Sequence, residues 1–204
     1  MNTIKQLFST CLLVASLSGV SQQAHAGVIR IDTDKTSYLQ GEWITATVRA
    51  SEFQHTLSGF FAGVRYQPQL TLHDVWFGNG FDDGLGSYRF VDSDAANGYV
   101  ALAEYADWAA DFAQLAVQQQ QEFVLASLRF KAADLGLFQF SVDPSYLGWL
   151  TDAGDLQTPT SVSRSFTVSA SVPAPAPLGL LALCGALLAW RRATHSSANN
   201  RVRQ

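Results

Sequence analysis

The stretch LSGFFAGVRYQPQL, residues 57–70, indicates the fold most directly. Apolar side chains recur at every second position, so one face of the segment is apolar throughout. This period of two is typical of a β-strand with one buried face, and the proline that follows marks a turn. The face predicted to be buried carries Phe60, Ala62, Val64 and Tyr66, and the other face carries Phe61, Gly63 and Arg65.

The same alternation returns further along the chain, in residues 44–50, 124–130, 138–142 and 162–168. Turn signals rich in glycine, asparagine and proline separate these segments. We count eight or nine strands, at the spacing that is typical of a two-sheet sandwich. The pattern therefore predicts an all-β fold with its core between two sheets.

One segment departs from the period of two. Residues 107–121 carry Trp108, Phe112, Leu115 and Ala116 at the spacing of one helix face. Such a stripe is typical of an amphipathic helix. We therefore expect a single short helix that crosses one end of the sandwich.

The charge of the chain is unevenly distributed. Of its 204 residues 48% are hydrophobic and 15% are charged, which is typical of a globular protein. All 17 acidic residues lie in residues 32–155, whereas residues 28–171 hold eight basic ones, a formal charge near −9 against −4 for the whole chain. Such a domain repels nucleic acid and anionic lipid, and is compatible with neutral sugars, with cations, or with solubility alone. Both cysteines, Cys11 and Cys184, lie outside it, so no disulfide is expected in the domain.

The first 26 residues have the three parts of a secretory signal peptide. Lys5 supplies a positive charge, and residues 7–20 form an apolar segment that is short for a membrane span. Ala24-His25-Ala26 places small residues at the two positions that signal peptidase reads. We expect cleavage after Ala26 and export of a domain that covers residues 27–171, with an uncleaved anchor as the alternative.

Residues 172–204 combine a proline-rich spacer, an apolar run at about 178–190 and a pair of arginines. This order resembles the PEP-CTERM sorting signal of Gram-negative bacteria that make exopolysaccharide, in which a Pro-Glu-Pro motif precedes an apolar helix and a basic end. The resemblance implies a transmembrane helix in the inner membrane and processing by an exosortase-type enzyme near Pro173-Ala174-Pro175. Ala174 stands where the motif has glutamate, and a plain single-pass anchor is the alternative.

Three segments of the domain resemble, in order, three segments of cohesin-like modules. They are LQGEWITATV at 39–48, the aromatic strand with its Tyr-x-Pro-x-Leu ending at 57–70, and FVLASLRFKA at 123–132. The resemblance covers most of residues 29–168. It implies a nine-stranded jelly roll, related in structure to certain carbohydrate-binding modules, and a role in non-catalytic adhesion. Cohesins proper bind a dockerin partner.

Aromatic residues form the first candidate binding site. Flat rings stack on sugar rings, and a neighbouring amide binds their hydroxyl groups. Aromatic side chains in a small sandwich are more often part of the core, and this is the alternative for each of them, including Trp43, Trp108 and Trp149. The candidate ligand-binding residues are Trp76, Asn79, Tyr88 and Tyr99.

A second candidate site is an acidic loop. Asp92, Asp94 and Asn97 offer three oxygen ligands within a short stretch, and calcium is bound by several such oxygens. The spacing differs from the EF-hand pattern by one inserted residue. The alternative is a solvated turn in which the Asx side chains cap the backbone.

The sequence contains no nucleophile elbow, no phosphate-binding loop and no metalloprotease helix motif. The two histidines of the domain, His55 and His73, are not at metal-ligand spacing. We therefore expect a non-catalytic binding or matrix module that is exported to the cell envelope or surface and contacts exopolysaccharide or a surface protein. The alternatives are a structural coat protein without a specific ligand and a glycan-active enzyme.

Overall fold

The computed structural model describes residues 27–171. The expected cleavage residue Ala26 and the expected tail, with Pro173, Ala174 and Pro175, lie outside these residues. Within residues 27–171 no helix is long and apolar enough to cross a membrane. The membrane helix predicted at about 178–190 lies outside the described residues.

The described residues form twelve β-strands and one α-helix. Nine strands have six or more residues, in agreement with the predicted number, and three have only two or three. The long strands are β1 (Val28–Thr33), β3 (Trp43–Ser51), β4 (Leu57–Arg65), β5 (Leu70–Phe77), β6 (Ser87–Asp94), β7 (Tyr99–Ala106), β8 (Glu122–Ala132), β9 (Gly136–Thr151) and β12 (Arg164–Ser169). The short elements are β2 (Ser37–Leu39), β10 (Leu156–Gln157), β11 (Thr160–Val162), the 3₁₀ turn η1 (Ala95–Asn97) and the helix α2 (Phe112–Gln119).

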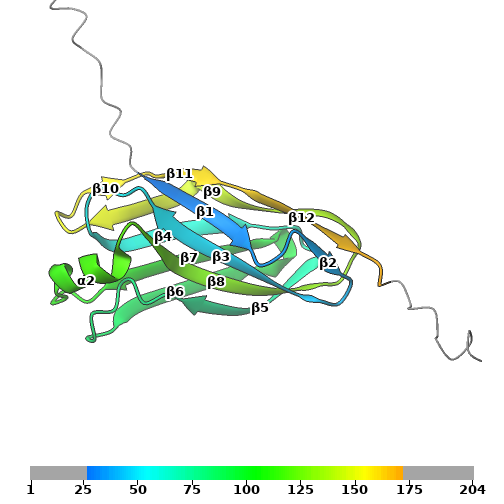
Figure 1. The fold of residues 1–204 in the computed structure, drawn as a ribbon, viewed down its shortest axis with the longest axis horizontal. Helices are drawn as coiled ribbons and strands as arrows, with labels where there is room; N and C mark the ends of the chain where they lie inside the picture. Colours follow the sequence, from blue (N-terminus) through cyan, green and yellow to red (C-terminus); the bar gives the residue numbers. More distant parts are fainter. Residues whose placement is uncertain (1–26, 172–204) are drawn as a thin grey trace, which may run out of the picture. The chain divides into compact units, whose positions relative to one another are not determined.

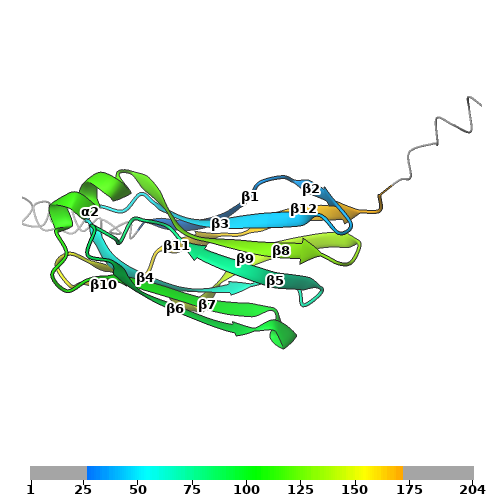
Figure 2. The ribbon, with the colours of Figure 1, turned by 90° about the horizontal axis from the view of Figure 1, so that it is seen from below.

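The strands build two sheets that pack face to face (Figure 1, Figure 2). One sheet has the order β11-β1-β3-β8-β5, and the other has the order β2-β12-β9-β4-β7-β6, with β10 paired to β9. The chain passes from one sheet to the other between β1 and β2 and again between β11 and β12, so continuous chain joins the sheets along that side. On the opposite side β5 and β6 are edge strands. The predicted all-β sandwich is confirmed.

The core lies between the sheets, where the alternation of the sequence places it. Phe60, Ala62 and Val64 of β4 have no exposed surface. Aromatic rings from the two sheets meet there, and the ring centroids of Phe130 in β8 and Phe140 in β9 are 4.8 Å apart. Full burial of one such side chain contributes about 1.5–3 kcal/mol. The packed core therefore holds both outer faces in place.

The predicted helix is shorter than expected, and its buried face is different. It begins after Asp111, whose carboxylate caps it by accepting hydrogen bonds from the backbone N–H groups of Ala113 and Gln114. Trp108 lies in the loop before the helix and is 89% exposed. Of the predicted stripe, Phe112 is half-buried, Leu115 is buried and Ala116 is exposed. The predicted stripe was wrong at Trp108 and Ala116, and the helix begins five residues after Asp107 because Asp111 caps it.

Gln119 fastens α2 to the sandwich. Its side chain is fully buried, and its Oε1 accepts a hydrogen bond of 2.8 Å from the N–H of Leu57. Its Nε2 donates to the carbonyl oxygens of Leu57, at 2.7 Å, and of Gly80, at 2.9 Å. One side chain therefore joins the helix, the start of β4 and the loop after β5.

Candidate binding face

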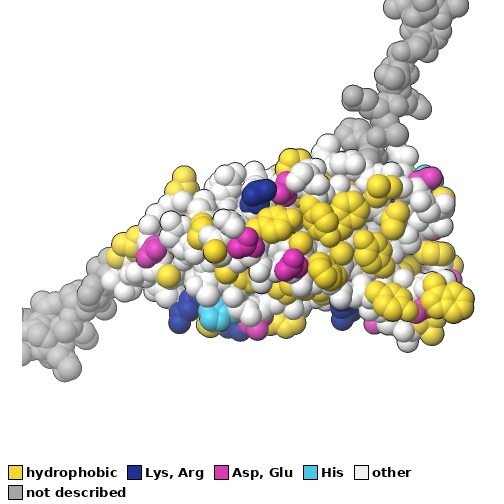
Figure 3. Space-filling view, turned by 180° about the vertical axis from the view of Figure 1, so that it is seen from behind, with side chains coloured by type: hydrophobic (Ala, Val, Ile, Leu, Met, Phe, Trp, Pro, Cys, Tyr) yellow, Lys and Arg dark blue, Asp and Glu magenta, His cyan; other side chains and the backbone are white. Residues whose placement is uncertain are grey.

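The outer face of strands β9, β4, β7 and β6 carries six aromatic side chains. Figure 3 shows hydrophobic side chains gathered on this face of the molecule, with acidic ones among and around them. Tyr88, Phe90 and Tyr105 are 60%, 54% and 36% exposed. A contiguous exposed apolar surface on a soluble domain is typical of an interaction site. We call this surface the aromatic face; it consists of Phe61, Tyr88, Phe90, Tyr99, Tyr105 and Tyr146.

Glycines beneath the rings make the aromatic face flat. A Cβ atom added at Gly59 would collide with the ring of Tyr105, and one added at Gly63 would collide with Tyr99. The strand pairing places Gly59 directly opposite Tyr105 on β7, whereas Gly63 is opposite Ala101, so that Tyr99 reaches it diagonally from the position opposite Arg65. Since no side chain stands upright at these positions, the aromatic rings lie against the backbone of the neighbouring strand. The face is therefore closely packed as well as apolar.

A bulge in β9 supplies the sixth aromatic ring. The register between β4 and β9 shifts between Ala62, which pairs with Leu147, and Gly63, which pairs with Asp143, so that β9 has three extra residues there. Asp143 holds this bulge, since its Oδ1 accepts hydrogen bonds from the N–H and the hydroxyl of Ser145, at 3.0 and 2.7 Å. Tyr146, the last bulged residue, comes within 5.2 Å of the ring of Phe61, centroid to centroid.

A charged pair borders the aromatic face near the bulge. The hydrogen bonds from Ser145, followed by the ion pair with Arg65, lower the pKa of Asp143, which is nearly buried. The guanidinium of Arg65 also lies 5.4 Å from the centroid of the Tyr99 ring, a favourable cation–π position. Charge is balanced at this border.

The border along β6 is acidic. Asp92 and Asp94 lie on the same outward row of β6 as Phe90, and Asp107 accepts a hydrogen bond of 3.3 Å from the hydroxyl of Tyr88. None of the ion pairs among residues 27–171 involves these three carboxylates. The aromatic face is therefore flanked on this side by uncompensated negative charge.

An interior carboxylate positions the edge strand of the aromatic face. Glu104 of β7 points between the sheets, is fully buried, and accepts hydrogen bonds from Ser87, at 2.6 Å, and from Nε of Arg89, at 2.9 Å. Burial raises the pKa of Glu104. Because Ser87 and Arg89 flank Tyr88 in β6, this contact holds the strand that carries Tyr88 and Phe90. Arg89, which points towards Glu104 from the edge strand β6, also discourages pairing with another sheet.

The four predicted sugar-binding residues do not share one surface. Tyr88 and Tyr99 belong to the aromatic face, whereas Trp76 projects from β5 in the other sheet and is 49% exposed. Asn79 lies in the loop that connects β5 in one sheet to β6 in the other. The expectation that such aromatic residues are core is confirmed for Trp149, and is wrong for Trp43, Trp76, Trp108 and Tyr88. Trp43, Trp76 and Tyr88 lie on the outward faces of their strands, and Trp108 lies in a loop.

The predicted calcium ligands lie at the end of β6. Asp94 caps η1, since its carboxylate accepts hydrogen bonds from the backbone N–H of Asn97, at 3.2 Å, and from its side-chain amide, at 2.6 Å. This is the geometry of the capped turn that the sequence offered as an alternative. No group of three or more His, Cys, Asp or Glu side chains within residues 27–171 is arranged to hold a metal ion. Calcium at Asp92, Asp94 and Asn97 stays a prediction.

Four aromatic residues of this face were not among the predicted site residues: Phe61, Phe90, Tyr105 and Tyr146. The sequence feature that could have indicated them is the second face of residues 57–70, where the aromatic Phe61 lies between Gly59 and Gly63. Aromatic residues on both faces of one strand cannot all be core in a two-layer sandwich. The partner strands that complete the surface are distant in sequence, so no local pattern groups them.

No family model matches this chain, and no curated protein matches it. Solved structures do match. A type II cohesin in a cohesin–X-dockerin complex from Acetivibrio cellulolyticus has a TM-score of 0.60 at 15% identity, over 70% of this chain and 99% of that one. A cohesin module of a family 33 glycoside hydrolase from Clostridium perfringens scores 0.57 at 9% identity, over 72% and 100%. A non-cellulosomal cohesin from the archaeon Archaeoglobus fulgidus scores 0.52 at 10% identity, over 71% and 91%.

These structures show the fold of residues 27–171, which is that of cohesin modules. The predicted cohesin-like jelly roll is therefore confirmed. Because the identities are low, the likeness concerns only the arrangement of the strands.

Proposed function

We propose that this chain, whose fold is that of cohesin modules, is an exported, non-catalytic binding module that holds a protein partner on its aromatic face. The single observation that carries the proposal is the aromatic face itself, in which six rings share one outer sheet surface and those of Phe61, Tyr99 and Tyr105 pack over glycines. Cohesin structures that resemble it include one crystallised as a cohesin–X-dockerin complex. A protein partner for this chain is our inference from that likeness and from the surface.

The energetics favour such a role. Tyr and other aromatic side chains contribute much of the affinity at protein interfaces because they bury large areas and lose little conformational entropy. Tyr88, Phe90 and Tyr105 are exposed, yet their strands are held by the core and by the buried Glu104 contact. The face is thus pre-organised, and little ordering free energy is lost when a partner covers it.

The acidic border indicates the charge of the partner. Asp92, Asp94 and Asp107 would be brought close to the partner's rim, and hydrogen bonds from Asn97 lower the pKa of Asp94, which keeps it ionised at neutral pH. A partner with an apolar centre and a basic rim fits this arrangement. We expect its association rate to fall as ionic strength rises, since salt screens charges at the rim.

Export and sorting belong to the same proposal and rest on the sequence alone. Cleavage after Ala26 would release the domain outside the cytoplasm, and the tail would hold it at the inner membrane until an exosortase-type enzyme acts near Pro173-Ala174-Pro175. The resemblance of the tail to PEP-CTERM signals favours extracellular polysaccharide as a second ligand, beside a protein partner at the cell surface.

Site-specific photo-crosslinking in the native host tests the aromatic face. A photoreactive phenylalanine analogue is placed at position 90 in one full-length variant and at position 76 in a matched control, since Trp76 is similarly exposed, at 49% against 54% for Phe90, on the other sheet. We expect position 90 alone to crosslink one saturable protein, identified by mass spectrometry. Equal crosslinking from both positions, or none from position 90, would contradict the proposal.

Titration of the identified protein then measures the contribution of one ring. Phe90→Ser should weaken binding by about tenfold or more, as expected for an aromatic anchor of roughly 1.4 kcal/mol or above. Trp76→Ser should leave the affinity unchanged. If both variants bind like the unaltered chain, the aromatic face is not the interface.

A further inference from the structure

A hollow of about 400 Å³ lies on the other side of the sandwich, where β3 ends and β8 begins. It is separate from the aromatic face, which belongs to the other sheet. Residues from the β3 end, the α2 end and β1 converge on it. The lining residues on which the argument depends are Arg30, Glu52, Phe53, Gln120, Gln121 and Glu122.

Two of these residues have a backbone conformation that L-residues rarely adopt. Glu52 has φ of 59° and Gln120 has φ of 48°, and they are the only non-glycine residues with positive φ among residues 27–171. Gln120 ends α2, a position commonly occupied by glycine, which adopts such angles without strain. Strained residues concentrate at binding sites, where the side chain has a role that glycine cannot fill. Both strained positions of the described chain line one hollow.

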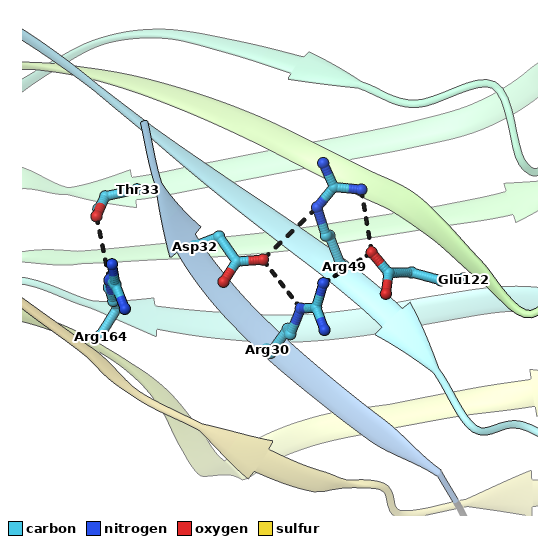
Figure 4. A network of polar contacts seen from close by, with 6 residues as sticks. All are labelled: Arg30, Asp32, Thr33, Arg49, Glu122 and Arg164. Atoms are coloured by element: carbon cyan, nitrogen blue, oxygen red, sulfur yellow. Dashed lines mark hydrogen bonds and ion pairs between the residues drawn. The ribbon is translucent and has the colours of Figure 1, made fainter. Parts of the chain in front are cut away.

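A closed ring of alternating charges forms the wall beside the hollow (Figure 4). Arg30 contacts Asp32 at 2.9 Å and Glu122 at 2.8 Å, and Arg49 contacts the same two carboxylates at 3.6 and 3.2 Å. These contacts use Nε and Nη2 of Arg30 and Oε1 of Glu122. Within residues 27–171, Nη1 of Arg30 and Oε2 of Glu122 have no hydrogen-bond partner, so both atoms remain for a ligand.

The lining selects for a class of ligand. The ring is neutral overall and Glu52 adds a negative charge, so an anion gains nothing there. Gln120 and Gln121 each offer donors and an acceptor. Phe53 supplies an apolar wall, itself held against the rings of Phe123 and Trp149, at centroid distances of 5.6 and 6.3 Å. Closely spaced neutral hydroxyl groups around an apolar C–H face match this lining.

We propose that this hollow binds a neutral saccharide unit, as found in an extracellular polysaccharide. Arg30 and Glu122 hydrogen-bond its hydroxyl groups, the two glutamines orient it, and Phe53 contacts its apolar face. The site lies on the opposite sheet from the aromatic face, so it does not depend on the proposed protein partner.

Binding of the full-length chain to a glycan array carrying neutral, uronate-containing and sulfated oligosaccharides tests the ligand class. We expect retention of neutral oligosaccharides. An array that retains none, or on which the anionic ones bind more strongly, overturns the proposal. Phe90→Ser should bind the retained oligosaccharide like the unaltered chain, so failure of this site and failure of the aromatic face are told apart.

Gln120→Gly, titrated with the retained neutral oligosaccharide, tests the residues. The variant relieves backbone strain while it deletes the side chain, so we expect an unchanged or higher melting temperature together with an affinity about fivefold lower or more. A purely structural residue would not separate the two readouts. Gln69→Ala, an exposed glutamine beyond the other end of β8, is the control and should change neither. An affinity of Gln120→Gly equal to that of the control overturns the proposal.

Discussion

Replacement of Gln119 by leucine is a severe test of how the helix is attached to the sandwich. The change keeps a side chain of similar size but replaces the amide by methyl groups, so the three hydrogen bonds to Leu57 and Gly80 are lost. Each buried backbone group left without a partner costs about 1–3 kcal/mol, and the carbonyl groups are expected at the low end because they have a second lone pair. Burial of the leucine returns about 1 kcal/mol. We therefore expect a net loss of about 3 kcal/mol in the free energy of unfolding.

Urea denaturation and thermal melting of the full-length chain measure this loss. For a domain of this size, about 3 kcal/mol corresponds to a fall in melting temperature of roughly 6–12 °C. The matched control is Gln118→Leu, one residue earlier in the same helix. The side-chain oxygen of Gln118 is buried and has no hydrogen-bond partner within residues 27–171, so its loss should be neutral or stabilise by up to about 1 kcal/mol.

A second variant tests the direction of the hydrogen bonds. A carboxylate in Gln119→Glu can still accept from Leu57 N–H, but it cannot donate to the two carbonyl oxygens. Its stability should therefore recover towards acidic pH, where the protonated acid donates again. The reasoning is refuted if Gln119→Leu and Gln118→Leu differ by less than about 1 kcal/mol.

Three further outcomes follow from the structure. Burial raises the pKa of Glu104 above its ordinary value of 4.5, so the native state binds more protons at this group than the unfolded state does. Its contribution to the free energy of unfolding should therefore fall as pH rises from 4.5 through the raised pKa. Glu104→Gln should lack that pH dependence when unfolding free energies are compared across pH. Gly63→Val should displace the Tyr99 ring, lose about 1–3 kcal/mol of stability in urea denaturation and abolish partner binding, whereas a variant that binds normally would show that the flat packing is dispensable. The intact mass of the protein from the native host should correspond to a chain that begins near Gly27 and ends near Pro175, and a species that keeps the apolar tail would indicate a simple anchor.

Much of the fold could be predicted from local patterns. The alternation in residues 57–70 placed Phe60, Ala62 and Val64 in the core because a strand turns successive side chains to opposite faces whatever its neighbours are. The helix was predicted from the same kind of pattern, but its start was not. Asp111 caps it through hydrogen bonds to the next turn, and an aspartate in an acidic loop does not show from sequence which helix position it takes.

The candidate sites depend on contacts between distant segments. Tyr105 lies over Gly59 only because β7 pairs with β4 in one register, and a shift by a single residue would bury the outward aromatic residues. From the sequence alone, Glu104 is indistinguishable from an ordinary charged strand residue. In the structure its partner strand places Ser87 and Arg89 beside it. Such pairings are properties of the assembled sheet.

By itself, the sequence determined the alternation along the main strands and the acidic charge of the domain, since these are properties of neighbouring residues, and it predicted a signal at each end of the chain. Only the tertiary structure decided that Phe61, Phe90 and Tyr105 form one surface. The same holds for the hydrogen bonds by which Gln119 joins the helix to the sandwich, and for the hollow that Glu52 and Gln120 line. The physical reason is that burial and hydrogen bonding depend on which segments lie side by side. Close packing of the whole core determines which segments these are.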